Sequence, residues 1–405
     1  MKIAAIITEY NPFHNGHKYQ IDTIRKLLGE DTAIIAIMSG NFTQRGELAI
    51  ADKTVRARAA IDAGVSLVLE LPFPYSSSSA EFFASAGVHI ANAIGVVDYL
   101  VFGSESGDIE ALYEIAENML TDKFQNTLRE CEADEKNANS GYPRLCELAY
   151  NKAFDAKTSK EVFSPNNILA IEYIKSLIRE KSSIKPLTVR REGAGYSDTF
   201  TAGESLQSAT AIRELICQND ISAFDYMPSS AASAYIDAIK AGKCPSDEAR
   251  LDLAVISHFR LSSPRGNDEI HDAGGGLYNR LYNFALQTSS ISSLTSMTET
   301  KKYTSARIRR AMWNSFFSVT SSVVRSTPAY TQVLGLDAVG RSLLKRIKKV
   351  SDFTVITKPS SYTAASPEVA VQKELSNKAD SIFALSLQCP DSSAFALSFT
   401  PYVKK

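Results

Sequence analysis

Two histidines three residues apart near the N-terminus are the residues best suited to chemistry. His14-Asn15-Gly16-His17 follows the apolar run Ile3 to Ile7 and leads into a helical pattern. Gly16 lets the backbone approach a ligand closely, and a helix N-terminus offers unpaired N–H groups to an anion. Two imidazoles at such a position can donate to phosphate oxygens and stabilise charge that grows on a phosphoryl group. We therefore expect phosphate chemistry at His14 and His17.

Two alternatives remain for this pair: a metal-binding pair, or a chance pair of surface histidines. A metal pair on a helix usually has i,i+4 spacing and needs a further ligand. The other histidines, at positions 89, 258 and 271, lack a partner at a useful spacing, and we expect them to be structural. The five cysteines include no C-x-x-C pair, which indicates neither a zinc site nor a disulfide framework.

The elements that must position the histidines alternate between strand and helix. We expect strands at 2–8, 32–38, 66–71, 97–103 and 186–191, and helices at 15–29, 51–64, 79–94, 166–181 and from about 208. Short apolar strands joined by helices favour a parallel α/β sheet covered on both faces. Ligands of such sheets bind at the carboxyl ends of the strands, where the first strand meets the histidine motif.

A second candidate site lies far along the chain, in Ser208-Ala209-Thr210-Ala211-Ile212-Arg213. Hydroxyls and N–H groups at a helix start can hold a phosphate, and the guanidinium of Arg213 can bridge two of its oxygens. The alternative is an ordinary N-cap followed by a solvent-facing arginine, and the motif alone favours that alternative.

The bulk composition is that of an ordinary soluble protein. The chain has 405 residues, a net charge of −1 and 44% hydrophobic residues, which is enough for two or three domains. We expect no signal peptide, because Lys2 stands alone and Glu9 interrupts the first apolar run. We expect no membrane span, because no apolar stretch approaches about 18 residues. With scattered cysteines, a cytoplasmic location is the expectation.

Taken together, the two motifs resemble the nucleotidyltransferase branch of the HIGH-motif superfamily. More of the chain is similar to one of its families, the bacterial tRNA(Met) cytidine acetate ligases. The similar stretches are Tyr10–His17, Met38–Glu47, Glu70–Pro72, Ala80–Ala84, Phe102–Glu105, Pro165–Leu169, Gly193–Tyr196, Lys302–Thr304, Arg307–Arg310 and Tyr330–Gly335. The resemblance is dense over residues 1–216 and thinner afterwards. It implies a Rossmann-like sheet of the HIGH type.

The resemblance also implies an activity. Such enzymes use ATP, which we expect to come with Mg²⁺, to activate acetate as acetyl-adenylate. They then transfer the acetyl group to the wobble cytidine of elongator tRNA(Met). Two alternatives are a nucleotidyltransferase that makes a small nucleotide cofactor, and a non-catalytic RNA-binding protein with a relic nucleotide pocket. The length of the chain argues against the first, and the presence of both motifs argues against the second.

Site residues follow from the resemblance and from the chemistry of the side chains. We expect His14, His17, Ser208, Thr210 and Arg213 to act on the phosphates. The resemblance implies that the ATP-binding residues are Ile7, Thr8, Glu9, Tyr10, Asn11, Pro12, Phe13, His14, Asn15, Gly16, His17, Lys18, Tyr19, Gln20, Gly103, one of the pair Asn166 and Asn167, and Arg190, with Arg191 as the alternative to Arg190. Of the two asparagines, we expect Asn167 to hydrogen-bond the nucleotide.

Three further features could serve the second substrate or lie elsewhere. The polar loop Gly40–Gly46 is expected to face acetate or the target cytidine. Lys53 and Arg56, in the next helix, are expected either to meet phosphate or tRNA or to be solvated surface bases. Glu70 and Glu81 are equally suited to be structural hydrogen-bonding residues or pocket carboxylates.

The domain organisation follows from pattern and charge. We expect a nucleotidyltransferase domain at 1–216 with a helical insertion at about 107–160, a helical region at 217–300, and a basic tRNA-binding domain of α or α+β type at 301–405. Residues 301–349 carry eleven bases and one acid, and Tyr303, Trp313 and Tyr330 lie among them. Bases neutralise backbone phosphates and aromatic rings stack on unpaired bases. The residues expected to bind tRNA are Lys301, Lys302, Arg307, Arg309, Arg310, Lys345 and Arg346.

Overall fold

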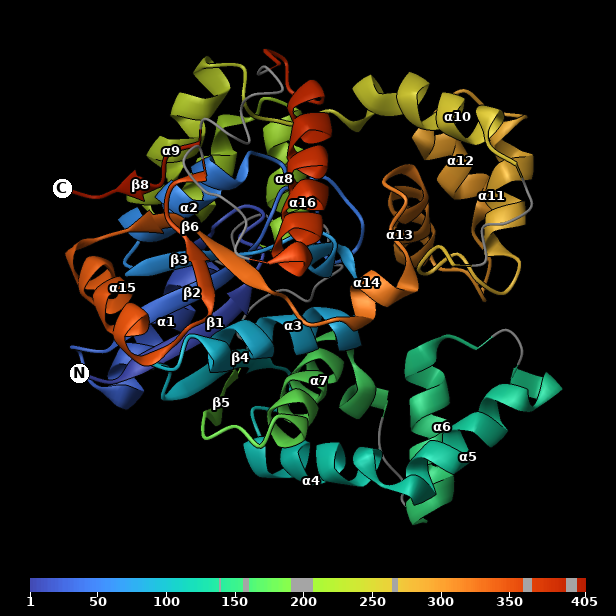
Figure 1. Ribbon diagram of the computed structural model, residues 1–405, viewed down its shortest axis with the longest axis horizontal. Coiled ribbons are helices and arrows are strands. Elements are labelled where there is room, and N and C mark those ends of the chain that lie inside the picture. Colours follow the sequence, from blue (N-terminus) through green and yellow to red (C-terminus); the bar gives the residue numbers. More distant parts are fainter. Residues whose placement is uncertain (138–139, 156–159, 191–206, 264–268, 360–365, 391–398) are drawn as a thin grey trace.

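A computed structural model describes residues 1–137, 140–155, 160–190, 207–263, 269–359, 366–390 and 399–405 (Figure 1). In this part of the chain, eight strands form one sheet in the order β5-β4-β1-β2-β3-β6-β7, with β8 paired to β6. The strands are β1 (Ile3–Thr8), β2 (Ala33–Ser39), β3 (Leu67–Leu71), β4 (Tyr99–Ser104), β5 (Lys185–Arg190), β6 (Tyr330–Leu336), β7 (Thr354–Ile356) and β8 (Tyr402–Val403).

The first five strands are parallel, which confirms the α/β sheet expected from the sequence. Their order 3-2-1-4-5 reverses between β1 and β4, and this reversal is the place where open α/β sheets bind ligands. Side chains of β1, β2 and β3 are buried on both faces, as expected of strands covered by helices on each side.

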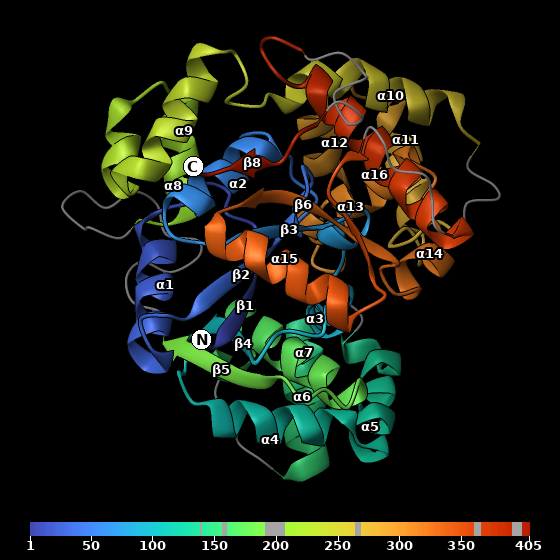
Figure 2. The same ribbon diagram turned by 60° about the vertical axis from the view of Figure 1, so that its left-hand side comes forward.

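Helices cover both faces of the sheet (Figures 1 and 2). One face packs against α1 (Asn15–Leu28), α2 (Lys53–Asp62), α8 (Ala209–Cys217) and α9 (Ser229–Lys240). The other face packs against α3 (Ala80–Ala93), α4 (Ile109–Leu120), α7 (Pro165–Arg179) and α15 (Ala338–Val350). The insertion adds α5 (Asp122–Ala133) and α6 (Tyr142–Phe154), which pack against each other and extend this second core.

A third apolar core lies beside the sheet. It combines α10 (Asp252–Leu261), α11 (Leu277–Ala285), α12 (Ile291–Thr298), α13 (Ser305–Phe316), α14 (Ser321–Arg325) and α16 (Pro367–Leu385) with Phe42, Leu48 and Phe73. These last three residues come from loops that follow β2 and β3. The helical bundle is therefore packed directly against the edge of the sheet where ligands bind.

Residues 301–405 do not form the separate domain expected from their composition. Strand β6 pairs antiparallel with β3, and β7 and β8 pair with β6, so this region completes the N-terminal sheet. The domain boundary expected at residue 216 does not separate two domains either, because α9, which follows it, packs on α2, which precedes it. Among the described residues, no helix combines the length and the apolar character needed to cross a membrane.

Candidate active site

A cavity of about 270 Å³ opens at the carboxyl ends of β1 and β4. The end of β1 and the start of α1 form one wall, β4, β5 and the start of α7 form a second, and the start of α8 closes a third. His14, His17, Ser208, Thr210 and Arg213 all line it. Two motifs that are almost two hundred residues apart in sequence therefore share one cavity.

The two imidazoles are fixed by the backbone at the start of α1. His14 is the N-cap, and its Nδ1 accepts from the Gly16 N–H at 3.0 Å. Nδ1 of His17 accepts in turn from the His14 N–H at 3.2 Å, so the two side chains form a reciprocal capping box. Because both Nδ1 atoms accept, each neutral ring carries its proton on Nε2. Each ring is thus set to donate from Nε2.

Gly16 is required for the position of the His14 ring. A Cβ atom at residue 16 would lie 2.8 Å from Cε1 of His14, closer than carbon atoms pack. The two rings lie with centroids 3.9 Å apart, and Tyr10 contacts His17 edge-on at 4.8 Å. The motif therefore holds both rings between the glycine backbone and a buried tyrosine.

The segment implied to bind ATP, Ile7 to Gln20, divides into two groups. Its cavity-lining members are Ile7, Thr8, Glu9, Tyr10, Asn11, His14, Gly16, His17, Tyr19 and Gln20. Phe13 is instead buried in the core, and its N–H donates to the Tyr235 hydroxyl at 2.9 Å. Pro12, Asn15 and Lys18 are not among the lining residues, and Lys18 pairs with Asp22 on the outer face of α1.

The second motif, Ser208 to Arg213, has features of both alternatives, the ordinary N-cap and the phosphate-binding site. Ser208 is an N-cap, and its Oγ accepts from the Ala211 N–H at 3.1 Å. Arg213, however, is not solvent-facing. Its Nη1 donates to the Asn11 carbonyl at 2.9 Å and its Nη2 donates to Thr210 Oγ1 at 3.2 Å. The guanidinium therefore ties α8 to the histidine loop.

The wall formed by β4 and β5 contains Gly103 and Arg190, which both line the cavity. The asparagine on this wall is Asn166, whereas Asn167 is buried and its Oδ1 accepts from the Glu105 N–H at 3.0 Å. The cavity is therefore lined by Asn166 and not by Asn167. Arg191 and the stretch Gly193–Tyr196 lie outside the described residues.

Several lining residues were missed by the sequence analysis. They are Phe83, Phe102, Leu169 and Tyr173 on the apolar side and Gln207 on the polar side, whereas Gln44 and Arg45 belong to the loop that was expected to face a substrate. The apolar ones belong to α3, β4 and α7, whose helical and strand patterns look like those of core residues. The hydroxyls of Tyr10 and Tyr173 are buried and have no hydrogen-bond partner within the described part of the chain.

The loop Gly40–Gly46 reaches the cavity through Gln44 and Arg45 only. The Gln44 N–H donates to Oε1 of Glu9 at 2.8 Å, and its side chain donates to the Ser78 carbonyl at 3.1 Å. Burial raises the pKa of Glu9 above its usual range, and the nearby Glu47 adds to that rise, while Arg213 and Arg56 oppose it. At the other end of the loop, Trp313 Nε1 donates to the Gly46 carbonyl at 2.9 Å.

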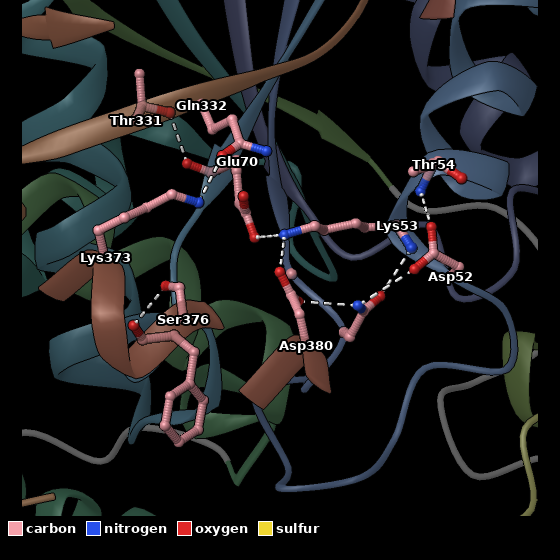
Figure 3. Close-up of polar contacts among 12 residues, drawn as sticks. Asp52, Lys53, Thr54, Glu70, Thr331, Gln332, Lys373, Ser376 and Asp380 are labelled. Atoms are coloured by element: carbon pink, nitrogen blue, oxygen red, sulfur yellow. Dashed lines mark hydrogen bonds and ion pairs between the residues drawn. The ribbon is translucent and has the colours of Figure 1, made fainter. Parts of the chain in front are cut away.

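Lys53 and Arg56 contradict both of their expected roles, because both are fully buried and contact neither solvent nor the cavity. Nζ of Lys53 lies 2.6 Å from Oε1 of Glu70 and 2.6 Å from Oδ2 of Asp380 (Figure 3). Arg56 donates to the carbonyls of Glu9, at 2.6 Å, and of Gly40. Glu70 is therefore a structural ion-pair partner, whereas Glu81 lies at the surface and pairs with Arg179.

The buried network around Lys53 reaches the loop that contributes Gln44 and Arg45 to the cavity. Asn41 Nδ2 donates to Asp380 at 3.0 Å, and its Oδ1 accepts from the Lys53 N–H at 2.8 Å. Lys373, also on α16, donates to Gln332 Oε1 at 2.7 Å. The network thus joins α16, β6, α2 and the start of the Gly40–Gly46 loop.

Some bases of the segment 301–349 are engaged in contacts within the protein, and others are exposed. Arg310 pairs with Asp272 at 2.6 Å, Arg309 pairs with Glu248, and Arg307 donates to the carbonyls of Asp272 and Gly274. The rings expected to stack on bases are not available for stacking, because Trp313 and Tyr330 are fully buried and Tyr303 is 9% exposed. Lys301 and Lys302 are exposed just before α13.

The two basic clusters lie at opposite ends of the strands. A Cβ at Gly46, in the loop after β2, would lie 2.7 Å from the Arg310 backbone, which places α13 at the cavity end. By contrast, α15 begins where the Asp337 N–H donates to the Ser66 carbonyl, just before β3, and Ser351 at its end donates to the Ala93 carbonyl. Figure 1 shows α13 and α15 on opposite sides of the molecule. Lys345 and Arg346 are exposed on α15, away from the cavity.

Comparison with known proteins bears directly on this cavity. The family model of the HIGH Nucleotidyl Transferases matches residues 1–395. A tRNA(Met) cytidine acetate ligase of Caldicellulosiruptor saccharolyticus is 38% identical over 396 residues, which cover 95% of this chain and 94% of that protein. The same ligase of Caldanaerobacter subterraneus is 38% identical over 370 residues, covering 89% and 90%.

The chain belongs to the tRNA(Met) cytidine acetate ligase family. Solved structures agree with this assignment. The chain resembles apo TmcAL of Thermotoga maritima with a TM-score of 0.91 and 31% identity, covering 100% of this chain and 99% of that one. It resembles the same protein bound with alpha-thio ATP with a TM-score of 0.89 and 30% identity, covering 100% of both chains. Family membership thus extends over the sheet and the helical bundle alike.

Proposed function

We propose that the protein is an ATP-dependent ligase that activates acetate as acetyl-adenylate and transfers the acetyl group to the wobble cytidine of elongator tRNA(Met). The observation that carries this proposal is the meeting of His14, His17, Ser208, Thr210 and Arg213 around one cavity. Its support is that the relatives are tRNA(Met) cytidine acetate ligases and that a structural neighbour was solved with an ATP analogue.

The nucleoside belongs on the β4–β5 wall in this proposal. Gly103 has no side chain to fill the space above β4, and Asn166 and Arg190 offer polar groups beside it. Phe102 and Leu169 supply the apolar surface that an adenine ring needs.

The phosphates belong between the starts of α1 and α8. Acetate is a poor acyl donor, and its attack on the α-phosphorus releases pyrophosphate through a transition state in which charge spreads over the phosphoryl oxygens. Nε2–H of His14 and His17 would donate to these oxygens, and the positive end of α1 favours the same charge. Ser208, Thr210 and Arg213 would hold the departing β- and γ-phosphates.

Mg²⁺ would be held by the triphosphate and water in this arrangement. The described residues contain no group of three or more His, Cys, Asp or Glu side chains that could hold a metal ion. Mg²⁺ takes octahedral oxygen ligands and commonly binds through nucleotide phosphates with one or two carboxylates. When bound, it would neutralise charge on the triphosphate.

The proposal is tested by following both half-reactions in the full-length protein. Acetate should stimulate exchange of pyrophosphate into ATP without tRNA, and labelled acetate should appear in tRNA(Met) once tRNA is added. The label should disappear when the wobble cytidine is replaced by uridine, which lacks the exocyclic amine. ATP turnover that ignores acetate would overturn the proposal.

A further inference from the structure

The chemistry assigned so far uses no proton acceptor, although the second half-reaction requires one. The exocyclic N4 of cytidine is a weak nucleophile because its lone pair is delocalised into the ring. When N4 attacks an acyl carbon, it must lose a proton. General-base assistance of this kind is usually worth about 10²–10⁴ in rate.

Glu9 is the one carboxylate among the described residues that line the cavity. Its Oε1 is held by the Gln44 N–H at 2.8 Å, which orients the carboxylate at the end of β1. No hydrogen bond to its Oε2 is present in the described part of the chain, and the residue lines the cavity without being fully covered. A fixed carboxylate with one oxygen that the described structure does not use is suited to accept a proton from a substrate.

The position of Glu9 relative to the other walls matches the acyl side of the reaction. The proposed nucleoside wall is at β4 and β5, and the proposed phosphate sites are at the starts of α1 and α8. The remaining wall, toward β2, is formed by Glu9, Gln44 and Arg45. In-line displacement puts the attacking acetate opposite the departing pyrophosphate, so the acetyl group and its later attacker belong on the side formed by Glu9, Gln44 and Arg45.

We propose that Glu9 is the general base of acetyl transfer. Oε2 of Glu9 takes a proton from N4 of the target cytidine as N4 bonds to the acetyl carbonyl carbon. The bond between that carbon and the phosphate oxygen breaks, and AMP leaves with the electron pair. The proton on Glu9 then passes to solvent. This inference rests on the proposed function and adds to it the residue that makes the amine reactive.

The charges around Glu9 suit this role. Burial raises the pKa of Glu9, the Gln44 N–H lowers it, Glu47 raises it, and Arg213 of α8 and Arg56 of α2 lower it. The Glu9 charge in turn adds to the raised pKa of the Tyr173 hydroxyl of α7. His14, His17 and Arg45 line the same cavity. Because burial is the largest of these effects, the pKa of Glu9 lies above its ordinary value of 4.5. A general base is most effective when its pKa is close to the working pH, so this rise suits catalysis near neutral pH.

The first test separates the two half-reactions in Glu9→Gln. The glutamine carbonyl can still accept from the Gln44 N–H, which keeps the loop in place. We expect transfer from chemically prepared acetyl-adenylate to tRNA(Met) to fall about 10²-fold or more, and acetate-dependent pyrophosphate exchange to fall much less. Loss of both half-reactions to the same degree, or of neither, would overturn the inference.

The second test reads the pH profile of the same transfer step. Glu9 must be ionised to act, so the wild-type rate should fall as pH drops through its raised pKa, and this acidic limb should be missing in Glu9→Gln. Glu47 does not line the cavity, although its Oε2 lies 3.5 Å from Nη2 of Arg213. Glu47→Gln removes a like charge and leaves Arg213 free to act on Glu9, so the acidic limb should move to lower pH. A limb that stays in place in both variants contradicts the inference.

Failure of the proposed function would look different. If the wild type exchanges no pyrophosphate in response to acetate and transfers no acetyl group, both the function and this inference are overturned. If the wild type does both and Glu9→Gln matches it, only the role of Glu9 is overturned.

Discussion

Two groups of polar residues, one lining the cavity and one around Lys53, differ in their surroundings. The cavity group, His14, His17 and Arg213, is held by backbone contacts and keeps donors near open space. The Lys53 group is closed on itself, and the side chains of Lys53, Glu70 and Asp380 are 2–4% exposed. The difference is what the polar groups face. The cavity group lines a space that a ligand can enter, and the Lys53 group faces other buried side chains.

The largest effect expected from breaking this contrast is on stability, in Lys53→Met. Its removal leaves Glu70 and Asp380 as buried carboxylates without their shared cation, and such losses typically cost about 3–5 kcal/mol. Chemical denaturation should show that decrease in the free energy of unfolding.

The matched control for Lys53→Met lies on α16 itself. Lys378 and Glu374 form a pair whose side chains are 56% and 65% exposed, so Lys378→Met should stay within about 1 kcal/mol of wild type. Similar losses of unfolding free energy in the two variants would show that the buried network contributes no more to stability than an exposed ion pair does.

The second effect is on activity, in His14→Ala. Loss of one preorganised donor to a developing oxyanion typically costs about 10²–10³ in rate. Acetate-dependent pyrophosphate exchange should fall by that factor, with unfolding affected far less than in Lys53→Met.

His258→Ala provides the control for the His14 variant, because His258 bonds to Ser315 away from the cavity and should leave exchange intact. Unchanged exchange in His14→Ala would remove His14 from the phosphate site.

The sequence identified the cavity group because its signals are local. His14, Gly16 and His17 lie within one helical turn directly after a buried strand, and a strand followed by a helix start is readable from periodicity and a glycine. The parallel core of the sheet was predictable for the same reason. The pairing of β6 with β3 was not, since a strand that joins a distant sheet edge looks the same as one in a separate domain.

The sequence misjudged Lys53 because nothing near it reveals its partners. Asp380 is 327 residues away on α16, and a lysine at the start of a helix normally faces solvent. Burial becomes visible only when α16 is packed over the loop that follows β2. Asn167 shows the same limit at finer scale, because adjacent asparagines on a helix point in different directions and only the fold decides which faces the cavity.

The smallest expected effect concerns tRNA and extends the same contrast to the two basic clusters. Lys301 and Lys302 are exposed just before α13, the helix that packs against the loop after β2, whereas Lys345 and Arg346 lie on α15 at the other end of the strands. We propose that only the first pair contacts tRNA phosphates during the reaction. Lys301→Glu with Lys302→Glu should weaken tRNA(Met) binding and flatten its salt dependence by about 0.7–0.9 in log–log slope per lost contact.

A control pair on α15 shows whether tRNA binding depends on a local surface or on the overall charge of the protein. Lys345→Glu with Arg346→Glu changes the net charge of the protein by the same amount but alters the far end, so a specific surface predicts little change in binding. Equal weakening by both pairs would mean that the tRNA responds to overall charge, or that it extends around the sheet to α15. Arg310 is unsuitable for this test, because its ion pair with Asp272 is buried beside Gly46, and its replacement would disturb the cavity loop as well as any tRNA contact.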